Sequence, residues 1–137
     1  MEMRVRYVEC DAMGVAHHSS YVAWLEMGRT ELLRSTGRTY AGLERAGTFL
    51  VVTRLELWYR RPVRYDDVLR VTTKVERATR FKIVHGYEIR LIEREGADVA
   101  ELVRTGDDLL AGGTTTLASV DGESKPTPLA DWLRGGS

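Results

Sequence analysis

Two hydrophobic periodicities follow one another along this chain, and their order restricts the folds that it can adopt. Apolar side chains recur at spacings of three and four over residues 21–32, and from Thr48 onward they recur at every second residue. The first spacing predicts an amphipathic helix, and the second predicts strands with one buried face. A long helix followed by consecutive strands with short connections is typical of an α+β protein in which a helix covers an antiparallel sheet.

The N-terminal part predicts a first strand and then the long helix. Residues Met3 to Val8 alternate apolar and basic side chains, which is typical of a strand. We expect Ser19 or Ser20 to cap the helix by accepting a backbone hydrogen bond. We expect Gly37 to end it in a left-handed conformation. One helix face then carries Tyr21, Trp24, Leu25, Gly28 and Leu32. A short second helix is predicted over residues 40–46.

The remaining chain predicts four longer strands and two short helical pieces. The apolar phase of the first of these strands is Val51, Thr53, Leu55, Leu57 and Tyr59, and a turn at Pro62 and Asp66-Asp67 follows. The other three strands are predicted over residues 69–75, 81–91 and 110–120. Asp98 and Glu101 form a capping-box pattern that predicts a helical turn inside the segment 96–108. Pro128 is expected to start a terminal helix containing Trp132, and the tail 135–137 is expected to fray.

The length, charge balance and cysteine count limit the class of protein. The 137 residues suit one domain spanning positions 1–137. Twenty basic residues balance twenty acidic ones, which argues against general nucleic-acid binding. Cys10 is the single cysteine, which excludes an intrachain disulfide and fits a reducing compartment. No secretion signal is evident at the N-terminus, and no run approaches the roughly 20 apolar residues that span a bilayer. We therefore expect a cytoplasmic protein with no membrane insertion.

The segment from Tyr7 to Tyr21 contains the residues on which a functional prediction can rest. It reads Tyr-Val-Glu-Cys-Asp-Ala-Met-Gly-Val-Ala-His-His-Ser-Ser-Tyr, a loop with one carboxylate followed by a helix start. With the helix residues that follow and the later segment Tyr59–Val63, it resembles the 4-hydroxybenzoyl-CoA thioesterase family. Within that family it is most similar to the acyl-CoA thioesterase branch associated with the bacterial Tol-Pal system. The resemblance covers nearly the whole chain apart from the insertion at 96–108.

This resemblance implies a fold, a reaction and an assembly. The fold would be the hotdog fold, α+β, in which one long helix is wrapped by an antiparallel sheet of about five strands. The reaction would convert acyl-CoA and water into a carboxylic acid and CoA, with no cofactor. The backbone N–H of His18 would polarise the thioester carbonyl, and its imidazole would line the same pocket. Members of this fold form homodimers or homotetramers with the active site between subunits.

The chemistry can also be argued from the residues. Hydrolysis of a thioester needs a nucleophile or a base, and donors for the developing oxyanion. Asp11 could attack the carbonyl directly to give a mixed anhydride, or it could activate a water molecule. The helix start near Ser20 offers unpaired N–H groups and the positive end of the helix dipole. Gly14 allows backbone geometry that a side chain would obstruct. A lone aspartate before a helix is otherwise usually a turn former.

Substrate contacts are predicted in two places. Gly14, Val15 and Tyr21 belong to the same segment as Asp11 and are expected to contact the substrate. The phosphates of CoA need basic partners, and candidates stand at two strand ends: Arg60 at one, and Arg77, Arg80 and Lys82 at the other. The resemblance favours the second cluster. A solvated, charged turn explains it equally well.

Several other reactive side chains have simpler explanations. His17 and His18 are adjacent, so they point differently and make a poor metal pair; no metal site is expected. His85 falls on the apolar phase of its strand and is expected in a core or an interface. Cys10 is expected to pack as a small apolar residue, since nothing visibly lowers its thiol pKa. The tryptophans are expected in a core or an interface: Trp24, Trp58 and Trp132.

Two other functions compete with hydrolysis. A hotdog hydratase or dehydratase acting on hydroxyacyl thioesters would use a neutral histidine with a nearby carboxylic acid. His18 with Asp11 or Glu26 could be assigned to those roles, although the loop pattern argues against them. A non-catalytic acyl-binding or scaffold protein is the third alternative, and the presence of both Asp11 and His18 speaks against it.

Overall fold

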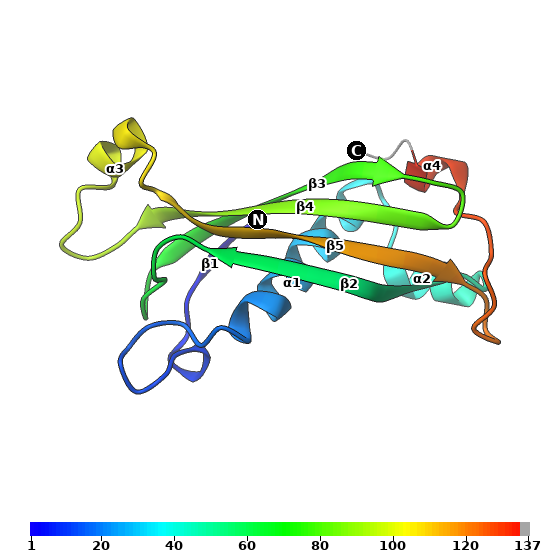
Figure 1. Cartoon of the computed structure of the whole chain (residues 1–137), viewed down its shortest axis with the longest axis horizontal. Helices are drawn as coiled ribbons and strands as arrows, with labels where there is room; N and C mark the ends of the chain where they lie inside the picture. The colour runs from blue at the N-terminus through cyan, green and yellow to red at the C-terminus, as the bar shows by residue number, and fades with distance from the viewer. Residues whose placement is uncertain (135–137) are drawn as a thin grey trace. The chain divides into compact units, whose positions relative to one another are not determined.

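The structure, a computed structural model, describes residues 1–134, so the predicted fraying of the tail 135–137 lies outside the described residues. Five strands form one antiparallel sheet in the order β1-β3-β4-β5-β2 (Figure 1). The strands are β1 Glu2–Arg4, β2 Phe49–Tyr59, β3 Val68–Ala78, β4 Lys82–Glu93 and β5 Leu109–Val120. The helices are α1 Ser20–Ser35, α2 Tyr40–Arg45, α3 Val99–Thr105 and α4 Asp131–Arg134, with a 3-10 turn at Tyr7–Glu9.

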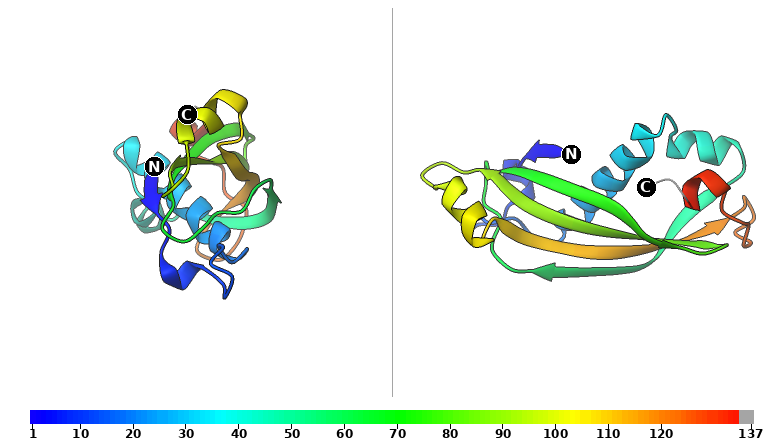
Figure 2. Two further views of the ribbon diagram at one scale, coloured as in Figure 1. Left: turned by 90° about the vertical axis from the view of Figure 1, so that its left-hand side faces the viewer. Right: turned by 90° about the horizontal axis from the view of Figure 1, so that it is seen from above.

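The predicted class, one long helix with a five-stranded antiparallel sheet, is confirmed. Helix α1 ends before Gly37, whose φ of 84° is the left-handed conformation that the sequence predicted. The Asp98 half of the capping box is confirmed, because its side chain accepts a hydrogen bond from the N–H of Glu101. The carboxylate of Glu101 bonds to Arg104 instead of closing the box. The resulting helix α3 is longer than the single turn expected, and Figure 2 shows it beside the ends of β4 and β5, which it connects. Among residues 1–134, no helix is both long and apolar enough to cross a membrane.

The prediction of a first strand over Met3 to Val8 is wrong beyond Arg4. Strand β1 pairs only Glu2–Arg4 with β3, and Tyr7–Glu9 then forms a 3-10 turn. The cause is a carboxylate: Glu9 Oε1 accepts the N–H of Arg6 at 2.8 Å, which bends the chain instead of leaving it extended. Alternation along the sequence carries no sign of this local hydrogen bond.

The predicted starts of two helices, α1 and α4, need correction. Ser20 is the first residue of α1, and its hydroxyl donates to the carbonyl of Glu9, while the hydroxyl of Ser19 bonds to His17 Nδ1. Neither hydroxyl is seen capping the helix within the described residues. Helix α4 starts at Asp131, three residues later than Pro128, and contains Trp132 as expected.

The chain divides into two compact units, and each has its own core. Unit 1 comprises Met1–Gly28, Leu57–Thr72 and Tyr87–Gly112. In its core, the beginning of α1 packs against the strands through Trp24 and Leu25, which are fully buried. The core also contains Val5, Tyr21, Val63, Leu69, Val71, Tyr87, Ile89, Leu91, Leu110 and Ala111. This is the unit that contains the segment from Tyr7 to Tyr21.

Unit 2 comprises Arg29–Glu56, Thr73–Gly86 and Gly113–Ser137. Its described core is formed by Leu33 of α1 and Leu43 of α2, together with Ile83, Leu117, Leu129 and Leu133. Leu50 packs on this core, whereas Val51 and Leu55 are 43% and 38% exposed. The prediction that Val51 and Leu55 face the core is therefore wrong. The same prediction is right for Leu57, which packs on the core of unit 1. Strict alternation fails here because both sides of the strand carry apolar residues, so the pattern cannot select one.

The three tryptophans differ in burial. Trp24 is fully buried, Trp132 is half-buried with the guanidinium of Arg38 4.0 Å from its ring centroid, and Trp58 is 44% exposed. Trp58 lies over Gly112, where a Cβ atom would come within 2.2 Å of its ring. The core prediction is confirmed for Trp24, and an interface role for Trp58 stays a prediction.

A buried ion pair secures the turn between β2 and β3 in unit 1. Asp67 is 1% exposed and accepts two hydrogen bonds from Arg94, at 2.9 Å from Nε and 2.7 Å from Nη2. It also accepts the N–H of Arg64 at 2.8 Å. The fork geometry and the additional donor satisfy a carboxylate that would otherwise be costly to bury.

Replacing Arg94 by Met should therefore destabilise the protein by about 3–5 kcal/mol, because the carboxylate of Asp67 would stay buried without its counter-ion. Urea unfolding followed by circular dichroism measures this change. Arg104→Met is the matched control, since Arg104 pairs with Glu101 at the surface and its loss should leave stability unchanged. Equal effects of the two substitutions would contradict the role given to the buried pair.

Candidate functional site

The site segment forms a small hairpin in unit 1 that leads into α1. Cys10 and Ala16 pair as an antiparallel bridge, and the N–H of Asp11 donates to the carbonyl of Val15 at 2.9 Å. The returning arm pairs with the chain after β2, since the N–H of Ala16 donates to the carbonyl of Val63 at 2.7 Å. The hairpin is thus held by backbone hydrogen bonds on both arms.

Asp11 stands at the start of the hairpin turn with its side chain exposed. Its Oδ1 accepts the N–H of Met13 at 2.8 Å, and its carbonyl accepts the N–H of Gly14 at 3.0 Å. Gly14 has a φ of 77°, a left-handed conformation that side-chain-bearing residues rarely adopt. Asp11 therefore forms the turn, and the hydrogen bond from Met13 engages only its Oδ1. The two explanations of this residue, turn former and reactive carboxylate, are compatible.

The beginning of α1 is joined to the same hairpin. The carbonyl of Glu9 accepts two hydrogen bonds at 2.8 Å, from the N–H of His17 and from the hydroxyl of Ser20. His18 follows with an exposed side chain. Its imidazole stacks on His17 with ring centroids 4.5 Å apart, so the expectation that the two side chains point differently is wrong. Within residues 1–134 the N–H of His18 has no hydrogen-bond partner, so it can donate to a bound group. Its carbonyl accepts a long, 3.4 Å hydrogen bond from the Tyr59 hydroxyl.

The predicted substrate-contacting residues Val15 and Tyr21 lie at different depths. Val15 is half-buried on the returning arm of the hairpin. Tyr21 is 3% exposed and packs between Trp24 and Tyr59, with ring centroids 4.9 Å from each. Burial raises the pKa of Tyr21 to about 12, although a hydrogen bond to the Val63 backbone opposes the rise. Tyr21 is thus a core residue beneath the hairpin, and substrate contact by it stays a prediction.

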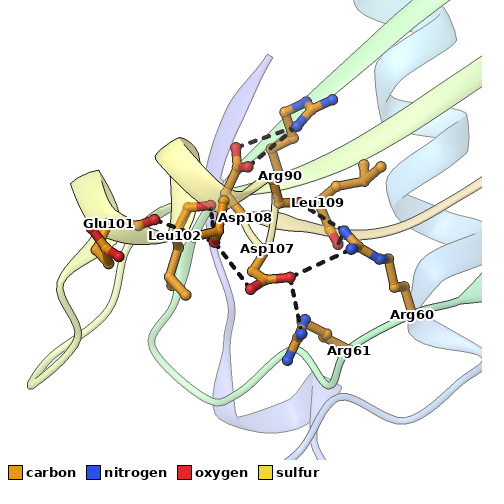
Figure 3. Close-up of polar contacts among 10 residues, drawn as sticks. Arg60, Arg61, Arg90, Glu101, Leu102, Asp107, Asp108 and Leu109 are labelled. Carbon is orange, nitrogen blue, oxygen red and sulfur yellow. Dashed lines mark hydrogen bonds and ion pairs between the residues drawn. The ribbon is translucent and has the colours of Figure 1, made fainter.

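Arg60 lies in a network at the end of β2 that sequence reasoning did not foresee. Its guanidinium donates to the carbonyl of Gly106 at 2.7 Å and also approaches Asp107, which Arg61 contacts at 2.9 Å. Figure 3 shows Asp107 between the two guanidinium groups. The hydroxyl of Thr105 and, next, Arg61 and Arg60 hold the pKa of Asp107 below its usual value. Arg60 therefore ties the insertion at 96–108 to β2. To bind phosphate as predicted, its guanidinium would have to contact the phosphate in addition to Gly106 and Asp107.

The second basic cluster lines a hollow of about 370 Å³ in unit 2. Arg77 and Lys82, both predicted from the sequence, come together there with Arg54, which was missed. Arg80 is not among the lining residues, and its guanidinium lies 5.2 Å from the ring centroid of Phe81. Threonines and one valine complete the wall: Thr53, Thr79, Thr116 and Val84. Arg54 could not be found from its own strand, because only the pairing of strands brings it to this wall.

Two side chains with potential chemistry are buried or packed on a core, as predicted. His85 is 4% exposed, and burial, assisted by the charge of Arg29, lowers its pKa to about 4. Cys10 packs on the core of unit 1. Burial raises the pKa of its thiol, and the nearby charges of Glu9, Asp11 and Asp67 raise it further. A thiol with a raised pKa is a poor nucleophile at neutral pH.

Comparison with known proteins identifies relatives of this chain. The provisionally named acyl-CoA thioesterase YneP of Bacillus subtilis is 38% identical over 88 residues, which are 64% of this chain and 64% of that protein. The acyl-CoA thioester hydrolase YbgC of Escherichia coli O157:H7 is 38% identical over 73 residues, 53% of this chain and 54% of YbgC. The matches thus span less than two thirds of these relatives.

The fold is shared with solved thioesterase structures. The DHNA-CoA thioesterase of Staphylococcus aureus superposes with a TM-score of 0.80 at 30% identity, over 94% of this chain and 78% of that one. The expected hotdog fold is thereby confirmed. The model of the thioesterase superfamily matches residues 13–97, a range that begins two positions after Asp11. Because this range is more than half of the chain, the protein belongs to the thioesterase superfamily.

Proposed function

We propose that this protein hydrolyses acyl-CoA thioesters, with Asp11 as the nucleophile or the general base. The observation that carries the proposal is the hairpin, which presents an exposed carboxylate on the segment hydrogen-bonded to the start of α1. Family membership and the relatives named as acyl-CoA thioesterases support the substrate class. Among the branches of the family, the sequence motif favours the one associated with the Tol-Pal system.

Two routes use these groups. In the first, a carboxylate oxygen of Asp11 attacks the thioester carbonyl carbon, CoA leaves as the thiolate, and water then hydrolyses the mixed anhydride to release the acid. In the second, Asp11 takes a proton from a water molecule whose oxygen attacks the same carbon, and CoA again leaves. Both routes place negative charge on the carbonyl oxygen. The N–H of His18 and the positive end of the α1 dipole would stabilise that charge.

Replacing Asp11 by Asn should lower kcat by a factor on the order of 10²–10⁴ while the fold stays intact, because the amide neither attacks nor accepts a proton from water. Release of free CoA thiol over a panel of short-chain, long-chain and aromatic acyl-CoAs measures turnover and identifies the preferred acyl group. Asp98→Asn is the matched control, since Asp98 also accepts a backbone N–H, at the start of α3, and should be dispensable.

Undiminished hydrolysis by Asp11→Asn would remove Asp11 from the mechanism. Hydration of crotonyl-CoA without thiol release would favour the hydratase alternative instead. Binding of acyl-CoA with neither reaction would favour an acyl-binding protein.

We further propose that the hollow in unit 2 receives the phosphates of CoA. Arg77 and Lys82 supply two cations there, and the Thr79 hydroxyl is an additional polar group in its wall. Guanidinium and ammonium groups are the usual partners of phosphate in proteins. Because these phosphates do not react, such contacts would bind the ground state and the transition state equally.

Arg77→Ala and Lys82→Ala should each raise KM several-fold and leave kcat nearly unchanged, because uniform binding is lost. Steady-state kinetics at low and high salt test this, and the wild-type KM should rise with salt more steeply than the KM of either variant. The effect of Arg80→Ala should be smaller. Arg70→Ala, which removes a surface partner of Glu2, should leave KM unchanged. A fall in kcat alone would contradict the placement.

We also propose that two copies associate along strand β2. This strand is at the end of the sheet order and exposes apolar side chains, including Val51, Val52 and Leu55 at 38–48%. An exposed, long, apolar edge strand is unusual in a monomer and favours pairing with another chain. A homodimer would cover it, and further pairing would give a homotetramer.

The double substitution Val51→Lys and Leu55→Lys should shift the protein toward monomers, because it places charges on the covered surface. Light scattering coupled to gel filtration gives the mass of the particle. Glu123→Lys, at an exposed position outside this strand, is the matched control. A wild-type protein that runs as a monomer at micromolar concentration would contradict this assembly.

The remaining expectations complete the proposal. We place residues 1–137 in one hotdog domain located in the cytoplasm, acting with water as the only co-substrate and with no cofactor.

A further inference from the structure

Glu9 is a buried acid that the proposed reaction does not use. Its side chain is 8% exposed, and its Oε2 accepts a 2.7 Å hydrogen bond from the indole N–H of Trp24. Its Oε1 accepts the backbone N–H of Arg6 at 2.8 Å, and the guanidinium of Arg6 lies 3.4 Å from Oε2. Each carboxylate oxygen thus has a short hydrogen bond, one from α1 and one from the chain before the hairpin.

The backbone of Glu9 forms the base of the hairpin that contains Asp11. Its carbonyl accepts the N–H of His17, at the end of the hairpin, and the hydroxyl of Ser20, at the start of α1. Two residues further along, the N–H of Asp11 donates to Val15. One residue therefore contacts α1 twice, through its side chain and through its carbonyl.

The charge of Glu9 suits these contacts. Burial alone would raise the pKa of Glu9, but hydrogen bonds from the Arg6 backbone, the Trp24 indole and the Arg6 guanidinium outweigh it. The pKa therefore lies below its usual value, and the side chain is a carboxylate at neutral pH. An ionised acceptor makes stronger hydrogen bonds than a neutral one.

We propose that Glu9 is a positioning residue, whose carboxylate anchors the Asp11 hairpin to α1 through the Trp24 indole. This inference rests on the proposed function, because Glu9 would affect catalysis only by holding Asp11 in place. The backbone ladder fixes the shape of the hairpin, whereas the carboxylate of Glu9 fixes its placement relative to Trp24. Without this contact the base of the hairpin would open more often, and Asp11 would move relative to the helix start.

Glu9→Gln tests the anchor with little change in shape. The amide nitrogen must replace one carboxylate oxygen, so it would face either the indole N–H of Trp24 or the N–H of Arg6, donor against donor. We expect kcat to fall on the order of tenfold or more with KM nearly unchanged, because small misplacements of a reacting group are costly. In an Asp11→Asn background, Glu9→Gln should lower the residual kcat no further. An equal fall in both backgrounds would overturn the proposal.

Amide hydrogen exchange provides a readout that does not depend on turnover. The N–H groups of Asp11 and His17 should exchange at least tenfold faster in Glu9→Gln than in the wild type. The N–H groups of Ser119 and Thr127, which are hydrogen-bonded in unit 2, should not change. Faster exchange at all four amides would indicate general destabilisation and overturn the anchor, as would no change at any of them.

Glu101→Gln is the matched control, because Glu101 is exposed and bonds only to Arg104 through its side chain among the described residues. It should alter neither kcat nor exchange. The two proposals can fail separately. Wild-type turnover by Asp11→Asn would overturn the proposed function. Faster exchange confined to the Asp11 and His17 amides in Glu9→Gln would still support the anchor. Loss of turnover in Asp11→Asn with unchanged exchange in Glu9→Gln would overturn the anchor alone.

Discussion

The geometry of the candidate site depends on one buried hydrogen bond, between the indole of Trp24 and the carboxylate of Glu9. A carboxylate inside an apolar core is costly unless donors satisfy it, and here the donors come from the helix and from the chain before the hairpin. The core and the site are therefore coupled. The same residue pair that completes the packing around Trp24 also limits where the segment with Asp11 can lie.

A second buried carboxylate has a similar role at the turn after β2. Asp67 is satisfied by the fork of Arg94 and by the N–H of Arg64, next to the point where Val63 accepts the N–H of Ala16. The returning arm of the hairpin is thus paired with a segment that is itself held by an ion pair. In unit 1 the buried polar interactions determine the conformation of the loops. The apolar residues of α1 and of the strands form the core, whose burial stabilises the fold.

Much of the fold could be predicted because its signals are local. The helix stripe from Tyr21, the stop at Gly37 and the cap at Asp98 each depend on neighbours within a few residues. Predictions failed where both alternatives had the same local pattern. The segment Met3–Val8 alternates as a strand does but is bent by Glu9, and both sides of β2 near Val51 are apolar.

The sequence by itself determined the order of helix and strands, the family, and the loop that presents Asp11, because periodicity and turn chemistry act over short distances. Only the tertiary structure decided which charged groups meet. Trp24 reaches Glu9 across 15 positions, and Arg60 reaches Asp107 across 47. The order of strands in the sheet likewise brings Arg54 of β2 and Arg77 of β3 to the wall of one hollow. A hydrogen bond between distant residues leaves no periodic signal, since it depends on how the elements pack and not on the elements themselves.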